Sequence, residues 1–346
     1  MTLIRRPSRA NLEFAIKAGI ATILSVGISR WIGLSSPYWA GVSAVVATAG
    51  SIGATISASV TRIIATLIAL LIAVGVVLLP VDGLLIAGLT VTVTLIVMSS
   101  LRLDAGARLA GASTLLLTAI PQGDPLSTAI GRGLNVPLGC VAAVAVGALI
   151  FPRRAVNALR IGLTEDLIGS FRLSCDALEQ WLDSTVEPDL NERLHSLLTD
   201  VAKRGAVYTE STFEPGGRGR HARNLAHAVE LTKRTSRVAR SIVLVAVGGA
   251  SDTAQRLLET EFRLVITTLH GAISEVDDSY WTDTPALAQR LHELLLPAIE
   301  NLDSVFRALR ERQATTAFGD RDVEHLLHAM WCIHALDEAF IDSSIA

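Results

Sequence analysis

Apolar residues run almost without interruption from residue 12 to residue 152, and only short polar hinges divide the run. A helix that spans a bilayer needs about 20 mostly apolar residues. Pieces near that length lie at residues 12–34, 37–57, 60–80, 83–101, 105–121 and 131–152. The pattern therefore predicts about six transmembrane helices. The fifth piece is short enough to re-enter the membrane from one side instead of crossing it.

The pattern changes after Pro152. From Arg153 onward, charged residues are frequent and apolar residues recur at helical spacing. Pro and Gly clusters separate predicted helices at residues 153–184, 189–209, 221–247, 251–275, 284–313 and 321–341. We expect an all-α protein with a transmembrane domain at residues 1–152 and a cytosolic helical domain at residues 153–346.

Composition supports a membrane protein, because half of the 346 residues are hydrophobic and the mean hydropathy is +0.46. Basic residues near the ends of spans stay on the cytoplasmic side. With the N-terminus inside, the cytoplasmic set is Arg5, Arg6, Arg9, Arg62, Arg102, Arg108, Arg153 and Arg154, and the outer set is Arg30 and Arg132. This distribution predicts a multi-pass protein of the cell inner (cytoplasmic) membrane with both termini in the cytoplasm.

Three cations fall within the apolar pieces, at Lys17, Arg62 and Arg132. A charge at such a depth is costly and commonly faces a cavity, although a long side chain can also extend to the interface. Glu13 is the one acid near these cations, and its spacing of four residues from Lys17 allows an ion pair on one helix face. The surplus of positive charge favours an anionic substrate.

The sixth apolar piece begins with Gly131-Arg132-Gly133-Leu134-Asn135-Val136-Pro137-Leu138-Gly139. Glycines and a proline beside polar residues predict a broken helix, which survives at membrane depth only against protein or water. Transporter sites are often built from such helices. Arg132 is therefore the foremost candidate for substrate binding, with Arg62, Lys17, Asn135 and Trp39 beside it. The second piece is rich in Ala and Gly, which predicts either close packing or a pore-lining helix.

Other chemistry finds little support in the sequence. The sequence contains no Gly-x-x-x-x-Gly-Lys nucleotide-binding loop, no Gly-x-Ser-x-Gly nucleophile motif and no His-Glu-x-x-His zinc-binding motif. We therefore predict no enzyme activity, no catalytic residues, no cofactor and no nucleic-acid partner. Cys140 and Cys175 stand alone, and His325, His328 and Cys332 share a helix face too sparsely to predict a metal site.

Several motifs of the apolar half resemble one known family. They are Ser36-Pro37-Tyr38-Trp39-Ala40-Gly41-Val42-Ser43-Ala44, then Thr61-Arg62-Ile63-Ile64-Ala65-Thr66, then Gly106-Ala107-Arg108-Leu109-Ala110-Gly111-Ala112-Ser113-Thr114, and Arg132 with Gly139, Phe151 and Pro152. Together they resemble the fusaric acid resistance and aromatic acid exporter family. One departure is Ala65, which stands where the family has a glycine after the third-span arginine.

The resemblance implies anion transport. It implies a homodimer as well, because many members carry two membrane units in tandem and this chain has one. Our first hypothesis is an exporter of small organic anions, mainly aromatic carboxylic acids, that is driven by the proton gradient through Glu13. The partners would be the anion, the lipid bilayer and a periplasmic adaptor. The alternatives are an anion channel on the same scaffold, as in the related plant malate channels, and a membrane scaffold or sensor that transports nothing.

Overall fold

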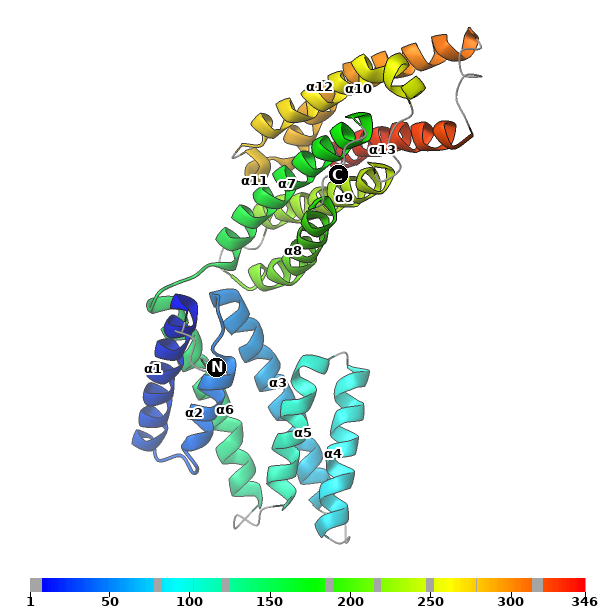
Figure 1. The fold of residues 1–346 in the computed structure, drawn as a ribbon. Coiled ribbons are helices and arrows are strands. Elements are labelled where there is room, and N and C mark those ends of the chain that lie inside the picture. The colour runs from blue at the N-terminus through cyan, green and yellow to red at the C-terminus, as the bar shows by residue number, and fades with distance from the viewer. Residues whose placement is uncertain are drawn as a thin grey trace, which may run out of the picture. The chain divides into compact units, whose positions relative to one another are not determined.

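The computed structural model describes residues 8–77, 83–101, 103–119, 125–183, 189–214, 219–246, 252–277, 279–312 and 320–345. Across these ranges the regular structure is entirely helical, as expected for an all-α protein. The chain forms two compact units, Met1–Ala155 and Val156–Ala346, which we describe separately (Figure 1).

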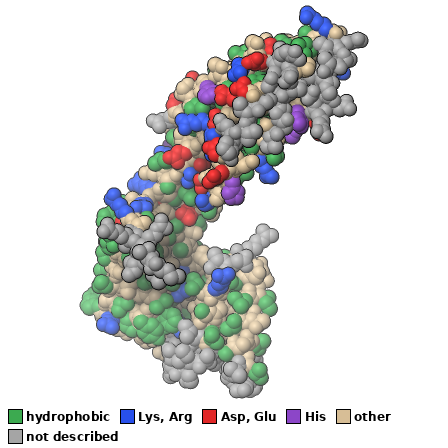
Figure 2. All heavy atoms as spheres, viewed as in Figure 1, with side chains coloured by type: hydrophobic (Ala, Val, Ile, Leu, Met, Phe, Trp, Pro, Cys, Tyr) green, Lys and Arg blue, Asp and Glu red, His purple; other side chains and the backbone are tan. Residues whose placement is uncertain are grey.

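The first unit contains six helices within its described residues. They are α1 (Arg9–Trp31), α2 (Tyr38–Ala47), α3 (Ile52–Val77), α4 (Gly83–Ser100), α5 (Asp104–Ala119) and α6 (Pro125–Leu149). Helices α1, α3 and α6 are long and apolar enough to cross a membrane. Hydrophobic side chains cover much of the outer surface of this unit (Figure 2). Water solvates such an apolar outer surface poorly, whereas the hydrocarbon chains of lipids solvate it well.

The expected boundary between the second and third apolar pieces is wrong. Helix α2 ends at Ala47, and α3 begins at Ile52 and continues through Arg62. The side chain of Ser51 accepts a hydrogen bond of 3.0 Å from the backbone N–H of Ala54, which is typical of a helix N-cap. Residues 57–60 contain no such signal and no helix breaker, so α3 passes through them.

Hydrogen bonds tie the segment 35–52 to α6 at one end and to Arg153, which follows α6, at the other. The side chain of Asn135 donates to the carbonyl of Ser35 at 2.8 Å. The backbone N–H of Ile52 donates to the carbonyl of Arg153 at 2.9 Å. The part of α6 from Asn135 to its end at Leu149 is about 21 Å long, whereas the ten residues of α2 cover about 15 Å. Residues 48–51 complete the distance without forming a helix.

Side chains satisfy the backbone of this non-helical piece. The N–H and the hydroxyl of Thr48 both donate to the carbonyl of Ala44, at 3.0 Å and 2.7 Å. The N–H of Ala49 donates to the hydroxyl of Thr55 at 3.1 Å. A backbone away from water requires such partners. The threonines at the break therefore let α2 stop inside the unit.

Helix α2 packs directly on the backbone of α6. A Cβ at Gly139 would overlap the carbonyl oxygen of Ala40 and approach the Cβ of Ser43 to 2.9 Å. Small side chains of both helices, including Ala44 and Cys140, form the adjoining core. Membrane helices associate through such small residues because lipid provides no hydrophobic drive between them. The Ala and Gly content of the second apolar piece therefore serves close packing.

The expected break at the start of the sixth apolar piece is also wrong. Helix α6 is continuous from Pro125 to Leu149, with Pro137 inside it. Proline removes one hydrogen bond, which membrane helices tolerate. The neighbouring glycines admit other backbones, because Gly131 lies against Ser35 and Gly139 lies against Ala40. They mark close approach, and the interruption lies between α2 and α3 instead.

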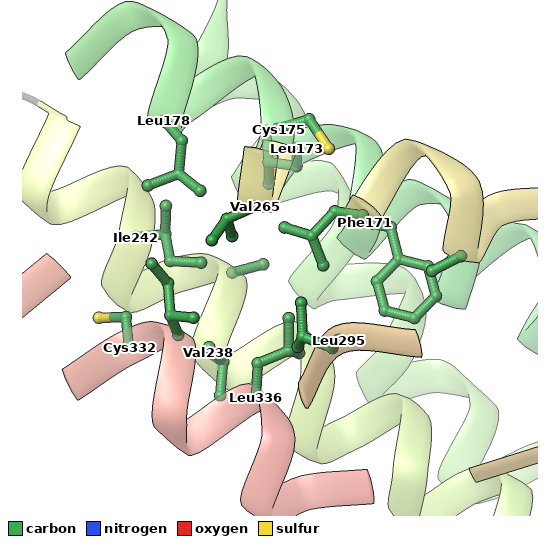
Figure 3. Packing of buried hydrophobic residues seen from close by; sticks show 14 of the residues in the cluster. Phe171, Leu173, Cys175, Leu178, Val238, Ile242, Val265, Leu295, Cys332 and Leu336 are labelled. Carbon is green, nitrogen blue, oxygen red and sulfur yellow. The ribbon is translucent and has the colours of Figure 1, made fainter. Parts of the chain in front are cut away.

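The second unit is a helical domain with a large apolar core. Its helices are α7 (Ala155–Asp183), α8 (Leu190–Ser211), α9 (Arg220–Ala246), α10 (Asp252–Glu275), α11 (Ser279–Thr282), α12 (Thr284–Glu311) and α13 (Asp320–Ile345). All but the short α11 correspond to helices predicted from the sequence. Side chains of α7, α9, α10, α12 and α13 meet in this core (Figure 3).

A partly buried ion pair joins α7 to α8 beside this core. Nε and Nη2 of Arg204 donate to the carboxylate of Asp166, at 2.9 Å and 3.3 Å. The guanidinium lies across Gly162, where any Cβ would overlap it. Burial raises the pKa of Asp166 above its ordinary value, although the bonds from Arg204 act in the opposite direction. The ionised carboxylate is therefore tolerated because Arg204 is present.

We expect Gly139→Ala to lower the thermal unfolding midpoint of the purified protein in detergent. The added methyl group forces α2 from α6, and overpacking of this kind costs about 1–3 kcal/mol. The matched control is Gly147→Ala on the same helix, where a Cβ would meet Thr55 at an ordinary 3.8 Å. Circular dichroism at increasing temperature compares the two. Equal midpoints would contradict the close approach of α2 to α6.

We expect Arg204→Ala to destabilise the second unit in a pH-dependent manner. Removing one partner of a buried ion pair costs roughly 3 kcal/mol. Without Arg204 the pKa of Asp166 rises further. The loss is therefore full at about pH 7.5 and shrinks toward about pH 5 as the carboxyl takes up a proton.

Thermal melts at the two pH values measure this effect. Lys203→Ala is the control, because Lys203 forms an exposed pair with Asp200 at 2.9 Å and should change little. A loss for Arg204→Ala that grows as the pH falls would refute this account of Asp166.

Candidate functional site

The three cations predicted from the sequence are all buried in the first unit. The exposed fraction is 4% for Lys17, 4% for Arg62 and 2% for Arg132. Asn135 is buried as well. Burying a charge is costly unless a partner compensates for it. The partners of each residue therefore indicate what it can do.

Two sides of the Arg132 guanidinium have partners, and its third edge is buried without a hydrogen-bond partner among the described residues. Its Nη1 donates to the backbone carbonyl of Ser113 in α5 at 2.8 Å. Its guanidinium carbon lies 3.8 Å from the centre of the Trp39 ring, in a cation–π contact. Its Nε and Nη2 have no hydrogen-bond partner among the described atoms. Helices α2, α5 and α6 thus fix this side chain and leave one edge of it unsatisfied.

Asn135 lies about one turn beyond Arg132 on α6, and its amide is already in use. Its Oδ1 accepts a hydrogen bond from the hydroxyl of Ser29 in α1. Its Nδ2 donates to the carbonyls of Ser35 and Gly131, both at 2.8 Å. These bonds fasten the loop between α1 and α2 to α6. The structure thus gives Asn135 a positioning role and leaves no N–H of its side chain for a ligand.

Arg62 lies deeper than its expected place at the opening of a span. It is ten residues beyond Ile52, or about 15 Å along α3. Its Nε is buried without a partner among the described residues, as are the hydroxyls of Ser43 and Ser59. Arg62 is close enough to Arg132 for their charges to repel. Helices α2, α3 and α6 therefore share a polar interior that the sequence did not reveal.

Glu13 does not form the ion pair expected from its spacing. It accepts from Arg9 at 3.1 Å and from Arg153 at 2.7 Å, and no ion pair joins it to Lys17. Glu13 is the one acid of the first unit whose side chain the structure describes. Within that part of the chain, Arg62 and Arg132 therefore have no acidic partner.

The remaining histidine and cysteine residues do not gather into a metal site. The described residues contain no group of three His, Cys, Asp or Glu side chains placed to hold a metal ion. Cys332 points into the core of the second unit, where burial raises the pKa of its thiol to about 12. His328 is exposed and lies against the ring of Trp331.

Part of the site was visible in the sequence. Arg132, Arg62 and Trp39 stood out there as polar or aromatic residues in apolar pieces. The carbonyl of Ser113 and the hydroxyls of Ser43 and Ser59 did not, because serine is common in membrane helices and a backbone group carries no sequence signal. Contact between residues some 90 positions apart, such as Trp39 and Arg132, is likewise absent from any local pattern.

Unpaired guanidinium N–H groups in an apolar interior are sites for an anion, since they leave hydrogen bonds unmade and a positive charge uncompensated. The fold and this interior define a class: a helical membrane protein with a buried cationic site. Comparison with known proteins gives the family. The chain belongs to the fusaric acid resistance protein family, whose profile matches residues 11–339. No curated protein matches the chain. Membership in this family implies a role in membrane transport or efflux.

Proposed function

We propose that the protein is a secondary transporter of the inner membrane that exports small organic anions, mainly aromatic carboxylic acids. The observation that carries the proposal is the buried Arg132 with its free N–H edge. Arg62 adds a second buried cation close by. A protein that only anchors a partner would gain nothing from such costly charges.

The proposed topology has six crossings and both termini in the cytoplasm. Glu13, near the start of α1, pairs with Arg153, which follows α6. The two ends of the first unit therefore lie on the same side, as an even number of crossings requires. Helix α2 contributes a crossing because residues 48–51 extend it along α6. The basic residues Arg9 and Arg153 support a cytoplasmic location for that side.

The interior provides both parts of an aromatic carboxylate site. Arg132 supplies charge and N–H donors, and Trp39 supplies an aromatic face against it. Apolar side chains such as Val136 and Ile63 line the neighbouring core. Ligand sites commonly combine an apolar wall with a few fixed polar groups. An interrupted crossing beside such a site is a frequent feature of secondary transporters.

Coupling, assembly and partners complete the proposal. Glu13 carries the coupling proton, and the ion pairs to Arg9 and Arg153 must open for it to do so. The functional unit is a homodimer in the lipid bilayer, and a periplasmic adaptor assists export across the envelope. These elements depend on the resemblance to the exporter branch of the family.

We expect proteoliposomes containing the protein to accumulate radiolabelled 4-hydroxybenzoate above equilibrium when a pH gradient is imposed. Arg132→Ala should lower the initial rate about tenfold or more, because a hydrogen-bonded charge to the substrate is lost. The control is Arg108→Ala, since Arg108 is exposed on α5 and its loss should change the rate by less than about twofold.

The alternatives give other results in the same assay. Flux that only equilibrates would identify an anion channel on this scaffold. An absence of flux for all organic anions tested, with the protein folded and inserted, would reject transport in favour of a scaffold or sensor.

We expect Glu13→Gln to remove the dependence of uptake on the pH gradient while equilibrating exchange of 4-hydroxybenzoate continues. Gln keeps the shape of the side chain and cannot exchange a proton. Counterflow of labelled against unlabelled substrate at equal pH measures exchange, and gradient-driven uptake measures coupling. Full gradient dependence in the variant would rule out Glu13 as the coupling site.

A further inference from the structure

We infer that Arg132 binds one carboxylate group side-on, through Nε and Nη2, with the indole N–H of Trp39 as a third donor. This inference rests on the proposed function for the chemical class of the ligand. It adds the binding mode, the donors and the residue that selects a carboxylate over a neutral group. All three N–H groups are buried without a partner among the described atoms.

The free edge of Arg132 has the geometry of a carboxylate fork. A guanidinium carries five N–H donors in a fixed plane. Nη1 is engaged by the carbonyl of Ser113. Nε–H and the neighbouring Nη2–H point in nearly the same direction, at a spacing that matches the two oxygens of a carboxylate. The edge that remains is therefore the one suited to bidentate binding.

The contact with Trp39 holds the guanidinium from one side. The centre of the ring lies 3.8 Å from the guanidinium carbon. This contact and the hydrogen bond at Nη1 restrict the movement of the side chain. A donor pair fixed before binding loses less entropy when the ligand arrives. The indole N–H of the same ring is also buried without a partner among the described atoms.

The electrostatic surroundings favour an anion over a neutral ligand. Arg132 has no described acidic partner, and Arg62 adds positive charge nearby. Without a ligand, three buried donors and a charge remain uncompensated, which is unfavourable. A carboxylate satisfies the donors and the charge together. A neutral amide of the same shape would satisfy neither the charge nor the fork, because its NH₂ group would face Nε–H or Nη2–H.

Isothermal titration calorimetry on the purified full-length protein in detergent tests this inference with benzoate and benzamide as probes. Benzoate should bind, and benzamide should bind at least about tenfold more weakly. Arg132→Lys should weaken benzoate binding about tenfold or more, because an ammonium group keeps the charge and loses the fork. Trp39→Phe should weaken it about threefold to tenfold, because Phe keeps an aromatic face and lacks the N–H.

Trp31→Phe is the matched control, since Trp31 is 86% exposed at the end of α1 and should leave benzoate affinity unchanged. Equal binding of benzoate and benzamide by the unmodified protein would overturn the inference without any variant. Unchanged affinity in Arg132→Lys would overturn the fork, and unchanged affinity in Trp39→Phe would overturn the third donor.

The outcomes also separate this inference from the proposed function. Fork-dependent binding without flux in proteoliposomes would uphold the site and reject transport. Normal flux together with normal benzoate affinity in Arg132→Lys would uphold transport and reject the site described here.

Discussion

The approach of α2 to the backbone of α6 at Gly139 is the constraint on which the first unit depends. A side chain at Gly139 would meet the carbonyl of Ala40, so only glycine allows this contact. Trp39 precedes Ala40, and its place over Arg132 follows from the same contact. Because α2 is held this closely, the chain can leave the helix after Ala47, where the hydroxyl of Thr55 accepts from the N–H of Ala49.

The charge of Arg132 in the first unit is compensated less completely than the charges of Asp166 and Arg204 in the second unit. The ion pair of Asp166 with Arg204 compensates both charges, so its net effect is structural. Arg132 has an aromatic ring and one carbonyl as partners, and two of its nitrogens remain free. Charge that is buried and incompletely satisfied reduces stability and is retained where a ligand completes it. Under the proposed function, this difference separates the binding site at Arg132 from a structural contact in the same chain.

Arg132 and Asn135 lie within one turn of α6, but their side chains have different partners. Both residues are polar and buried, and the sequence made Arg132 the foremost binding candidate with Asn135 beside it. All hydrogen bonds of Asn135 go to α1, the following loop and α6 itself. Because Asn135 holds the loop that leads into Trp39, it supports the arrangement in which Arg132 keeps a free edge.

The sequence by itself determined the all-α class, an apolar first part and an amphipathic second part, and the helices of the second unit within a few residues. These features depend on local composition and periodicity, which can be read from short stretches of the sequence. It also made Arg132, Arg62, Lys17 and Trp39 candidates for substrate binding, since polar and aromatic residues in apolar pieces are conspicuous.

Only the tertiary structure decided where α2 ends and α3 begins, that α6 is continuous, and that Glu13 pairs with Arg153 and not Lys17. It also brought Trp39 against Arg132. In each case the deciding interaction joins residues far apart in the chain. Glycine illustrates the reason: the same residue that breaks an isolated helix permits two helices to touch, and only the packed structure shows which effect prevails.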